Sequence, residues 1–118
     1  MDLQPCVDSI RRYTAELLRR NAQAQEQARS DLPAMVEVIR ATRGVKRAYL
    51  YGSLAKQAFH PQSDVDIAVE GLRPGERDDL KDRLSALTRF PVDVRNLDSS
   101  PEFRELIEFY GELLHAQP

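Results

Sequence analysis

Apolar residues recur every three or four positions over residues 2–28, and this spacing predicts a first helix. Its apolar stripe consists of Val7, Ile10, Tyr13, Leu17 and Leu18. From Arg19 to Arg29 the sequence RRNAQAQEQAR offers no large apolar residue on any face. A helix of that composition projects from the body or packs on a partner, and a solvated linker is the alternative interpretation.

A second helix is predicted between Asp31 and Gly44. Asp31 is a good N-cap, and Pro33 fits the first turn, where a missing N–H does no harm. A glycine at position 44 is typical of the residue that ends a helix. The apolar positions of this helix are Leu32, Met35, Val36 and Ile39.

Three short segments have the composition of strands and alternate with helical patterns. They are VKRAYLY (45–51), DVDIAVE (64–70) and VDVRNL (92–97). Residues 73–90 predict a helix between the second and third segments, with Leu80, Leu84 and Leu87 on one side. A last helix is expected from a cap at Ser99 or Ser100 through Leu114. The order predicts an α/β fold, in which helices flank a small mixed β-sheet.

Two aspartates stand one residue apart in the second predicted strand. Because residues two apart in a strand share a face, Asp64 and Asp66 face away from the apolar side of the sheet. Two like charges on one face repel each other, and a divalent cation such as Mg²⁺ relieves that repulsion. Asp93 lies between two valines in the third strand, as Asp66 lies between Val65 and Ile67 in the second. If the two strands are neighbours, three carboxylates meet at one edge of the sheet, and three carboxylates can bind two metal ions. The alternative is a solvated strand face. Arg95 would pair with Asp93 or contact a nucleotide.

A Gly-Ser pair follows the first predicted strand and opens the short helical segment SLAKQAF. Gly52 lets a ligand approach the backbone without meeting a Cβ, and the Ser53 hydroxyl with nearby N–H groups can bind a phosphate. Lys56 adds a positive charge about one turn later. On its own the pair is more typical of a turn with a helix cap. The order of strand, Gly-Ser, ten residues and Asp-x-Asp favours the phosphate site.

Composition narrows the class of protein. With 118 residues the chain is expected to form one domain, and a net charge of −2 argues against nucleic-acid binding. The single cysteine, Cys6, excludes an internal disulfide and favours a reducing cytoplasm. No apolar run approaches the ~18 residues of a membrane helix. We therefore expect a cytoplasmic protein with no membrane contact.

The segment GSLAKQAFHPQSDVDIAV resembles the signature of the minimal nucleotidyltransferases, a branch of the DNA polymerase beta-like superfamily. The resemblance covers about residues 32–115. It implies a polymerase beta-like nucleotidyltransferase domain over residues 31–118, with residues 1–30 as an added N-terminal helical extension. It also implies phosphate binding at Gly52 and Ser53, with Lys56 beside them, and catalytic metal ligands at Asp64, Asp66 and Asp93. Gln57 departs from the pattern, because the family often has glycine there.

The resemblance further implies transfer of a nucleoside monophosphate, from ATP, to an acceptor hydroxyl with the help of two Mg²⁺ ions. Larger relatives carry an extra domain for the acceptor, and this chain is too short for one. Minimal members are commonly antitoxins encoded beside a HEPN-domain toxin, and some attach AMP to a tyrosine of that toxin. We therefore predict an ATP-dependent protein adenylyltransferase that acts as an antitoxin.

Two other functions stay open from the sequence. The chain would also serve as a non-catalytic antitoxin that neutralises a partner by binding alone. The third function is transfer to a small molecule such as an aminoglycoside, for which a homo-oligomer would have to build the acceptor pocket.

Overall fold

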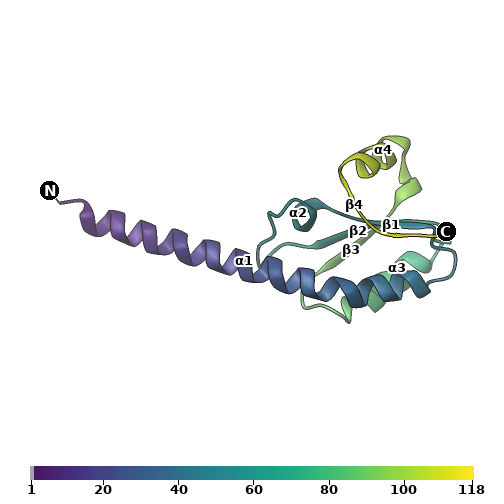
Figure 1. The fold of residues 1–118 in the computed structure, drawn as a ribbon, viewed down its shortest axis with the longest axis horizontal. Helices are drawn as coiled ribbons and strands as arrows, with labels where there is room; N and C mark the ends of the chain where they lie inside the picture. Colours follow the sequence, from purple (N-terminus) through teal and green to yellow (C-terminus); the bar gives the residue numbers. More distant parts are fainter. Residues whose placement is uncertain (1) are drawn as a thin grey trace.

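The computed structural model describes residues 2–118 and contains a four-stranded mixed sheet with helices on both faces (Figure 1). The strand order is β3-β2-β1-β4, with β1 antiparallel to β2 and to β4, and β2 parallel to β3. This confirms the predicted α/β class. The elements are α1 (Gln4–Ala41), β1 (Arg47–Tyr51), α2 (Gly52–Ala55), β2 (Val65–Glu70), α3 (Glu76–Ser85), β3 (Val92–Asn96), η1 (Leu97–Ser99, a 3₁₀ turn), α4 (Pro101–Tyr110) and β4 (Glu112–Ala116).

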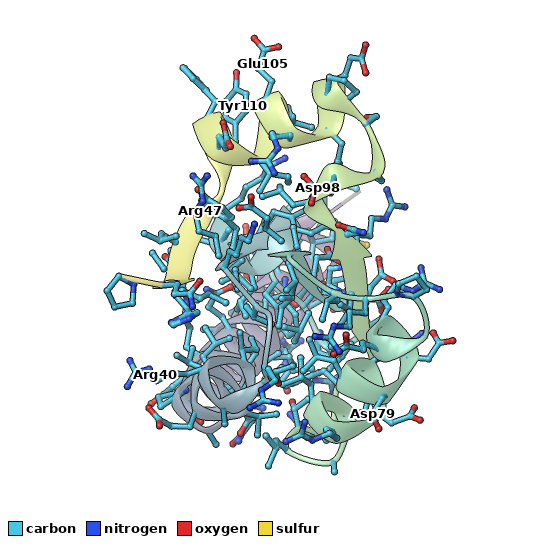
Figure 2. All side chains as sticks on the ribbon, turned by 90° about the vertical axis from the view of Figure 1, so that its right-hand side faces the viewer. Arg40, Arg47, Asp79, Asp98, Glu105 and Tyr110 are labelled. Atoms are coloured by element: carbon cyan, nitrogen blue, oxygen red, sulfur yellow. The ribbon has the colours of Figure 1, made fainter. Side chains whose placement is uncertain are left out.

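The two faces of the sheet have different coverings. One face packs on α1 and α3, and the other lies under α4 (Figure 2). Alternate strand residues fill the first layer, as the pattern of Val65, Ile67 and Val69 predicts. The layer under α4 is smaller and consists of Tyr49, Ala68, Leu97 and Ile107, with Tyr51 and Phe103 packed against it. Because α4 covers only part of its face, the remainder is available for a site.

The first helix is continuous for 38 residues, so the predicted division into two helices near Asp31 is wrong. Asp31 does not cap a helix, because its carboxylate accepts hydrogen bonds from Thr88 Oγ1 (2.8 Å) and Gln27 Nε2 (3.0 Å). Pro33 lies inside α1 at an exposed position, where water can serve the carbonyl that the proline leaves unpaired. Buried residues on both sides of it, Ala28 and Met35, hold the helix against the body.

The N-terminal half of α1 projects from the body (Figure 1). The molecule measures 66 × 30 × 24 Å, and its radius of gyration of 17.8 Å exceeds the ~13–14 Å of a compact chain of this length. The apolar stripe predicted for the first helix therefore lies largely in solvent, and buried contacts begin only at Ala24. Within residues 2–118, no helix is both long enough and apolar enough to cross a bilayer.

The chain ends in a strand, so the predicted continuation of the last helix through Leu114 is wrong. Gly111 marks the change of direction. Its N–H donates to the carbonyl of Ile107 (2.7 Å), and a Cβ at this position would lie 2.6 Å from the same oxygen. The following residues form β4, which pairs with the edge of β1 that would otherwise be free.

Candidate active site

A row of polar side chains crosses the sheet where β1 ends and where β2 and β3 begin. Tyr51 stands opposite Asp66 in the β1–β2 pair, and Asp66 stands opposite Asp93 in the β2–β3 pair. Residues that are paired across a sheet point to the same face. Asp64 is exposed and immediately precedes β2. The structure thus brings Asp66 and Asp93 side by side, with Asp64 two residues away along the chain.

The negative charge of this row is only partly compensated. Burial, followed by repulsion from Asp64 and Asp93, raises the pKa of Asp66 to about 6. Burial, followed by the negative charges of Asp66 and Asp93, raises the pKa of Tyr51 to about 12. Arg95 opposes both shifts, and its Nε lies 3.5 Å from Asp93 Oδ2. Of the two roles predicted for Arg95, the structure therefore contains the ion pair.

The donor chemistry of the row suits a hard divalent cation, because carboxylate oxygens are the ligands that Mg²⁺ prefers. A cation would also relieve the repulsion that raises the pKa of Asp66. Within residues 2–118, however, no three Asp, Glu, His or Cys side chains are already arranged as a metal site. The three aspartates suit Mg²⁺ in their chemistry, and their side chains would have to turn toward a common point to hold it.

Gly52 gives the Asp66 carboxylate its space. Its backbone has φ +74°, in the left-handed region that side chains rarely adopt. A Cβ on this residue would come closer to Asp66 Oδ2 than real Cβ atoms do. The sequence predicts a close approach at Gly52, but to a ligand. The structure adds an approach to the chain's own carboxylate.

The segment after Gly52 is held by α1. Gln25 donates from Nε2 to the Leu54 carbonyl (3.3 Å) and to Gln57 Oε1 (3.0 Å), and its Oε1 accepts from the Phe59 N–H (3.2 Å). Arg29 Nη2 also donates to the Leu54 carbonyl (3.2 Å). The sequence does not predict these roles for Gln25 and Arg29. In a run of polar residues, nothing distinguishes a side chain that bonds a distant loop from one that faces solvent.

Gln57 has a backbone conformation that glycine adopts more readily than glutamine does. Its φ is +61°, and it is the only non-glycine residue within residues 2–118 with a positive φ. Glycine, which the family often has here, adopts this region without strain. The bond from Gln25 therefore holds in place a backbone that glutamine adopts less readily.

Ser53 and Lys56 lie at the turn next to the acidic row. Ser53 is the second residue of the four-residue α2, and the exposed Lys56 directly follows α2. A cavity of about 240 Å³ opens between this turn and α4, and its walls include Gly52, Lys56 and Tyr110. On α4 the apolar side chains of Leu106, Phe109 and Tyr110 are exposed, and so is that of Leu113 in β4.

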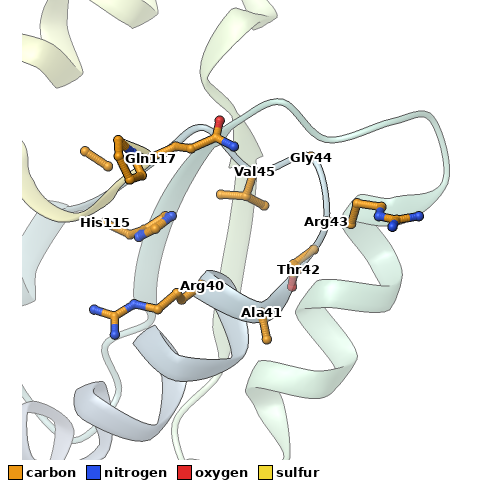
Figure 3. A pocket seen from close by; sticks show the side chains of 10 residues that line it. Arg40, Ala41, Thr42, Arg43, Gly44, Val45, His115 and Gln117 are labelled. Atoms are coloured by element: carbon orange, nitrogen blue, oxygen red, sulfur yellow. The ribbon is translucent and has the colours of Figure 1, made fainter.

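Another cavity, of about 570 Å³, lies at the opposite end of β1, between the end of α1 and the C-terminal segment (Figure 3). Arg40, Arg43 and His115 are among its lining residues. None of the residues predicted to form the site lines it, so it lies apart from the acidic row.

Comparison with known proteins agrees with this geometry. Residues 34–117 match the family model described as polymerase beta, nucleotidyltransferase. The chain belongs to this nucleotidyltransferase family. The match takes in the acidic row and the Gly-Ser turn, and it leaves out the projecting part of α1. No protein with a curated description matches the sequence.

Solved structures share the nucleotidyltransferase fold. A toxin–antitoxin structure with AMP-PNP matches with a TM-score of 0.65 and 24% identity, over 73% of each chain. A complex of a tri-AMPylated HEPN toxin from Shewanella oneidensis with an MNT antitoxin matches with a TM-score of 0.59 and 21% identity, over 75% of this chain and 72% of the other. The structure of MntA–HepT gives 0.58 and 21%, over 75% and 73%. At these identities the likeness establishes the fold.

Proposed function

We propose that this protein transfers AMP from ATP to a hydroxyl of a partner protein, and that it acts as the antitoxin of a HEPN toxin. The observation that carries the proposal is the register of Asp66 and Asp93 beside the Gly52 turn. Fold relatives include a toxin–antitoxin structure with AMP-PNP and one whose HEPN toxin is AMPylated, which supports this substrate and this partner.

The aspartates would hold the magnesium, with Asp64 and Asp66 on the nucleotide side and Asp93 on the acceptor side. When bound, Mg²⁺ supplies charge neutralisation at the phosphates and lowers the pKa of the acceptor hydroxyl. Asp93, which is paired with Arg95, would accept the acceptor's proton once Arg95 releases it. Ser53 and Lys56 would bind the outer phosphates of ATP.

The apolar surface around Phe109 suits a protein acceptor. Leu106, Phe109, Tyr110 and Leu113 are exposed, and Leu106 and Tyr110 also line the cavity at the Gly-Ser turn. Contiguous apolar surface of this kind usually marks a protein-binding site. A partner seated there would bring an acceptor side chain toward the cavity wall formed by Gly52 and Lys56. The same surface favours the second candidate function, neutralisation by binding alone.

Asp64→Asn separates chemistry from contact, because Asp64 is exposed and its replacement leaves the core unchanged. The protein is incubated with ATP, Mg²⁺ and the product of the neighbouring toxin gene, and AMP adducts are measured by mass spectrometry. We expect adducts with the wild type and a loss of at least ~100-fold with Asp64→Asn. Asp79→Asn, an exposed aspartate on α3, is the matched control and should keep full activity.

Toxicity in cells decides between the two functions. If Asp64→Asn still neutralises the toxin as well as the control does, binding alone is the function. If the wild type leaves every candidate partner unmodified with each nucleoside triphosphate, the transfer proposal is wrong.

A further inference from the structure

The projecting half of α1 carries an apolar stripe that is largely exposed to solvent. Leu3, Ile10 and Tyr13 are between 60% and 70% exposed, and Leu17 and Leu18 are also exposed. With Val7, these residues span roughly 140° of the helix circumference at ~100° per residue. A stripe of this width on a projecting helix is an interaction surface.

The stripe continues the row by which α1 packs on its own body. Intervals of four and three residues lead from Leu3 through Ile10 and Leu17 to the buried Ala24 and Ala28. Such a seam rotates by only ~20° per heptad on a straight helix. Leu17 and Asn21 line a cavity together with His60, Pro61 and Gln62 of the body. The exposed stripe therefore faces nearly the same side as the body does.

We propose that this stripe binds the same stripe of a second copy of the chain, as an antiparallel helix pair. The body occupies this side of α1 from Asn21 onward. A partner helix on the stripe would therefore stop where the body begins. In a parallel pair the partner helix would continue into that body. In an antiparallel pair the partner helix starts next to the body of the first copy. The body of the second copy then lies beyond the N-terminus of the first copy's helix.

Charge also favours the antiparallel arrangement. Residues 2–9 contain Asp2 and Asp8 and no basic residue, for a charge of −2. Residues 11–20 contain four arginines and Glu16, for a charge of +3. With the pair centred between Ile10 and Thr14, antiparallel pairing sets residues 2–9 of each copy beside residues 15–22 of the other, whose charge is +1 from Arg19, Arg20 and Glu16. Parallel pairing instead sets each segment beside its own copy, like beside like.

The cavity at the junction of helix and body offers a seat for the partner's first turn. Its volume is about 420 Å³, and Asn21 and Pro61 are among its lining residues. With the pair centred between Ile10 and Thr14, Leu3 of the second copy lies opposite Asn21. The Oδ1 atom of Asn21 is buried and has no hydrogen-bond partner within residues 2–118. In the partner's first turn, the Gln4 N–H donates to Asp2, Pro5 has no N–H and the Val7 N–H donates to Leu3, which leaves the N–H of Cys6 to supply the missing donor.

Mass measurements at increasing concentration test the pairing. Light scattering or sedimentation of the full chain should reveal a species of twice the 13.5 kDa monomer, whose fraction rises with concentration. Ile10→Glu places a charge in the centre of the stripe and should raise the dissociation constant at least tenfold. Ala15→Glu adds the same charge outside the stripe and should leave the dimer intact.

Both substituted positions are exposed in the single chain, so at concentrations where the wild type is monomeric, circular dichroism should give the same melting temperature for wild type and variants. A wild type that stays monomeric at every concentration would overturn the proposal, and so would equal weakening by the two glutamates. No nucleotide or toxin enters this measurement, so its outcome is independent of the proposed function.

Disulfide trapping tests the orientation. Cys6 is the only cysteine and is exposed. In the antiparallel pair the two Cys6 residues lie ~18 Å apart along the axis, because each is six residues from the centre. Mild oxidation should therefore not crosslink the wild type, whereas Cys6→Ser/Tyr13→Cys should crosslink readily near the centre. Crosslinking of Cys6 without crosslinking at position 13 would overturn the antiparallel arrangement.

Discussion

At the scale of single residues, the acidic row depends on a contact between Gly52 and Asp66. The glycine has a left-handed backbone, and the carboxylate of Asp66 fills the space that a side chain on Gly52 would need. Asp66 is half-buried there, between the turn and the neighbouring Asp93. The position of the central carboxylate is therefore set by the absence of a Cβ one strand away.

Gly52→Ala is expected to lower both stability and activity. The left-handed backbone disfavours alanine by about 1 kcal/mol, and displacement of the Asp66 carboxylate adds on the order of 1–2 kcal/mol. Gly75→Ala is the matched control, because Gly75 has φ +87° and nothing within 4 Å of an added Cβ. Urea unfolding should show the larger loss for Gly52→Ala. Equal losses would mean that Asp66 moves aside freely.

The raised pKa of Asp66 makes the metal-free protein sensitive to pH. Its folded-state pKa of about 6 lies above the ordinary value of 3.8 for an aspartate, so the folded protein holds this proton more tightly than the unfolded chain does. The stabilisation is complete below about pH 4 and is lost as pH rises through about 6. Solvent screens this half-exposed group, so the effect is on the order of 1 kcal/mol.

Asp66→Asn removes this proton and isolates its effect from that of the other carboxylates. Between about pH 4 and neutral pH, the free energy of unfolding of the wild type should fall by about 1 kcal/mol relative to that of Asp66→Asn. A difference that is independent of pH would show that Asp66 titrates normally.

Sequence alone predicts that Asp66 and Asp93 lie on neighbouring strands, because strand alternation separates both from their apolar neighbours. It says less about the residues that support the row. The bonds from Gln25 and Arg29 to the Leu54 carbonyl join positions far apart in the chain. Polar side chains carry no periodic signal for such contacts, and only the folded chain reveals them.

At the scale of elements, the two wrong boundaries have the same physical cause. Asp31 and Pro33 together have the pattern of a helix start, yet packing of Ala28 and Met35 on the body keeps α1 continuous through them. The apolar residues around Leu114 fit helical spacing, yet the free edge of β1 draws them into a strand. In both places tertiary contacts override a local signal.

The close packing of α1 on the segment after α2 leads to a prediction for Ala28. This residue is 1% exposed, so Ala28→Leu must push α1 away from the body and should lower the free energy of unfolding by about 1–3 kcal/mol. Ala15→Leu makes the same change at an exposed position of the same helix and should leave stability within about 0.5 kcal/mol. Chemical unfolding of both variants measures the difference, and equal stabilities would contradict this packing.

At the scale of the whole molecule, α1 belongs both to the projecting N-terminal segment and to the nucleotidyltransferase domain. The family model begins at residue 34, inside α1, and the predicted boundary at residue 30 falls in the same uninterrupted helix. The contacts of Ala24, Gln25 and Arg29 with the body lie upstream of both points. We infer that the catalytic part needs α1 from about Asn21, and that residues before it serve assembly.

Two truncations distinguish this division from the one at residue 30. Removal of residues 1–20 takes away exposed surface, and only Val7 and Glu16 of its described residues are even partly buried. At concentrations where the full chain is monomeric, the melting temperature should therefore change little. Removal of residues 1–30 also deletes Ala24, Ala28 and the bonds of Gln25, which should lower stability by several kcal/mol. The longer deletion frees the segment around Gln57 as well, so nucleotide binding by calorimetry should weaken with it. If both truncated proteins melt and bind alike, the boundary at residue 30 is correct and the contacts of Gln25 are dispensable.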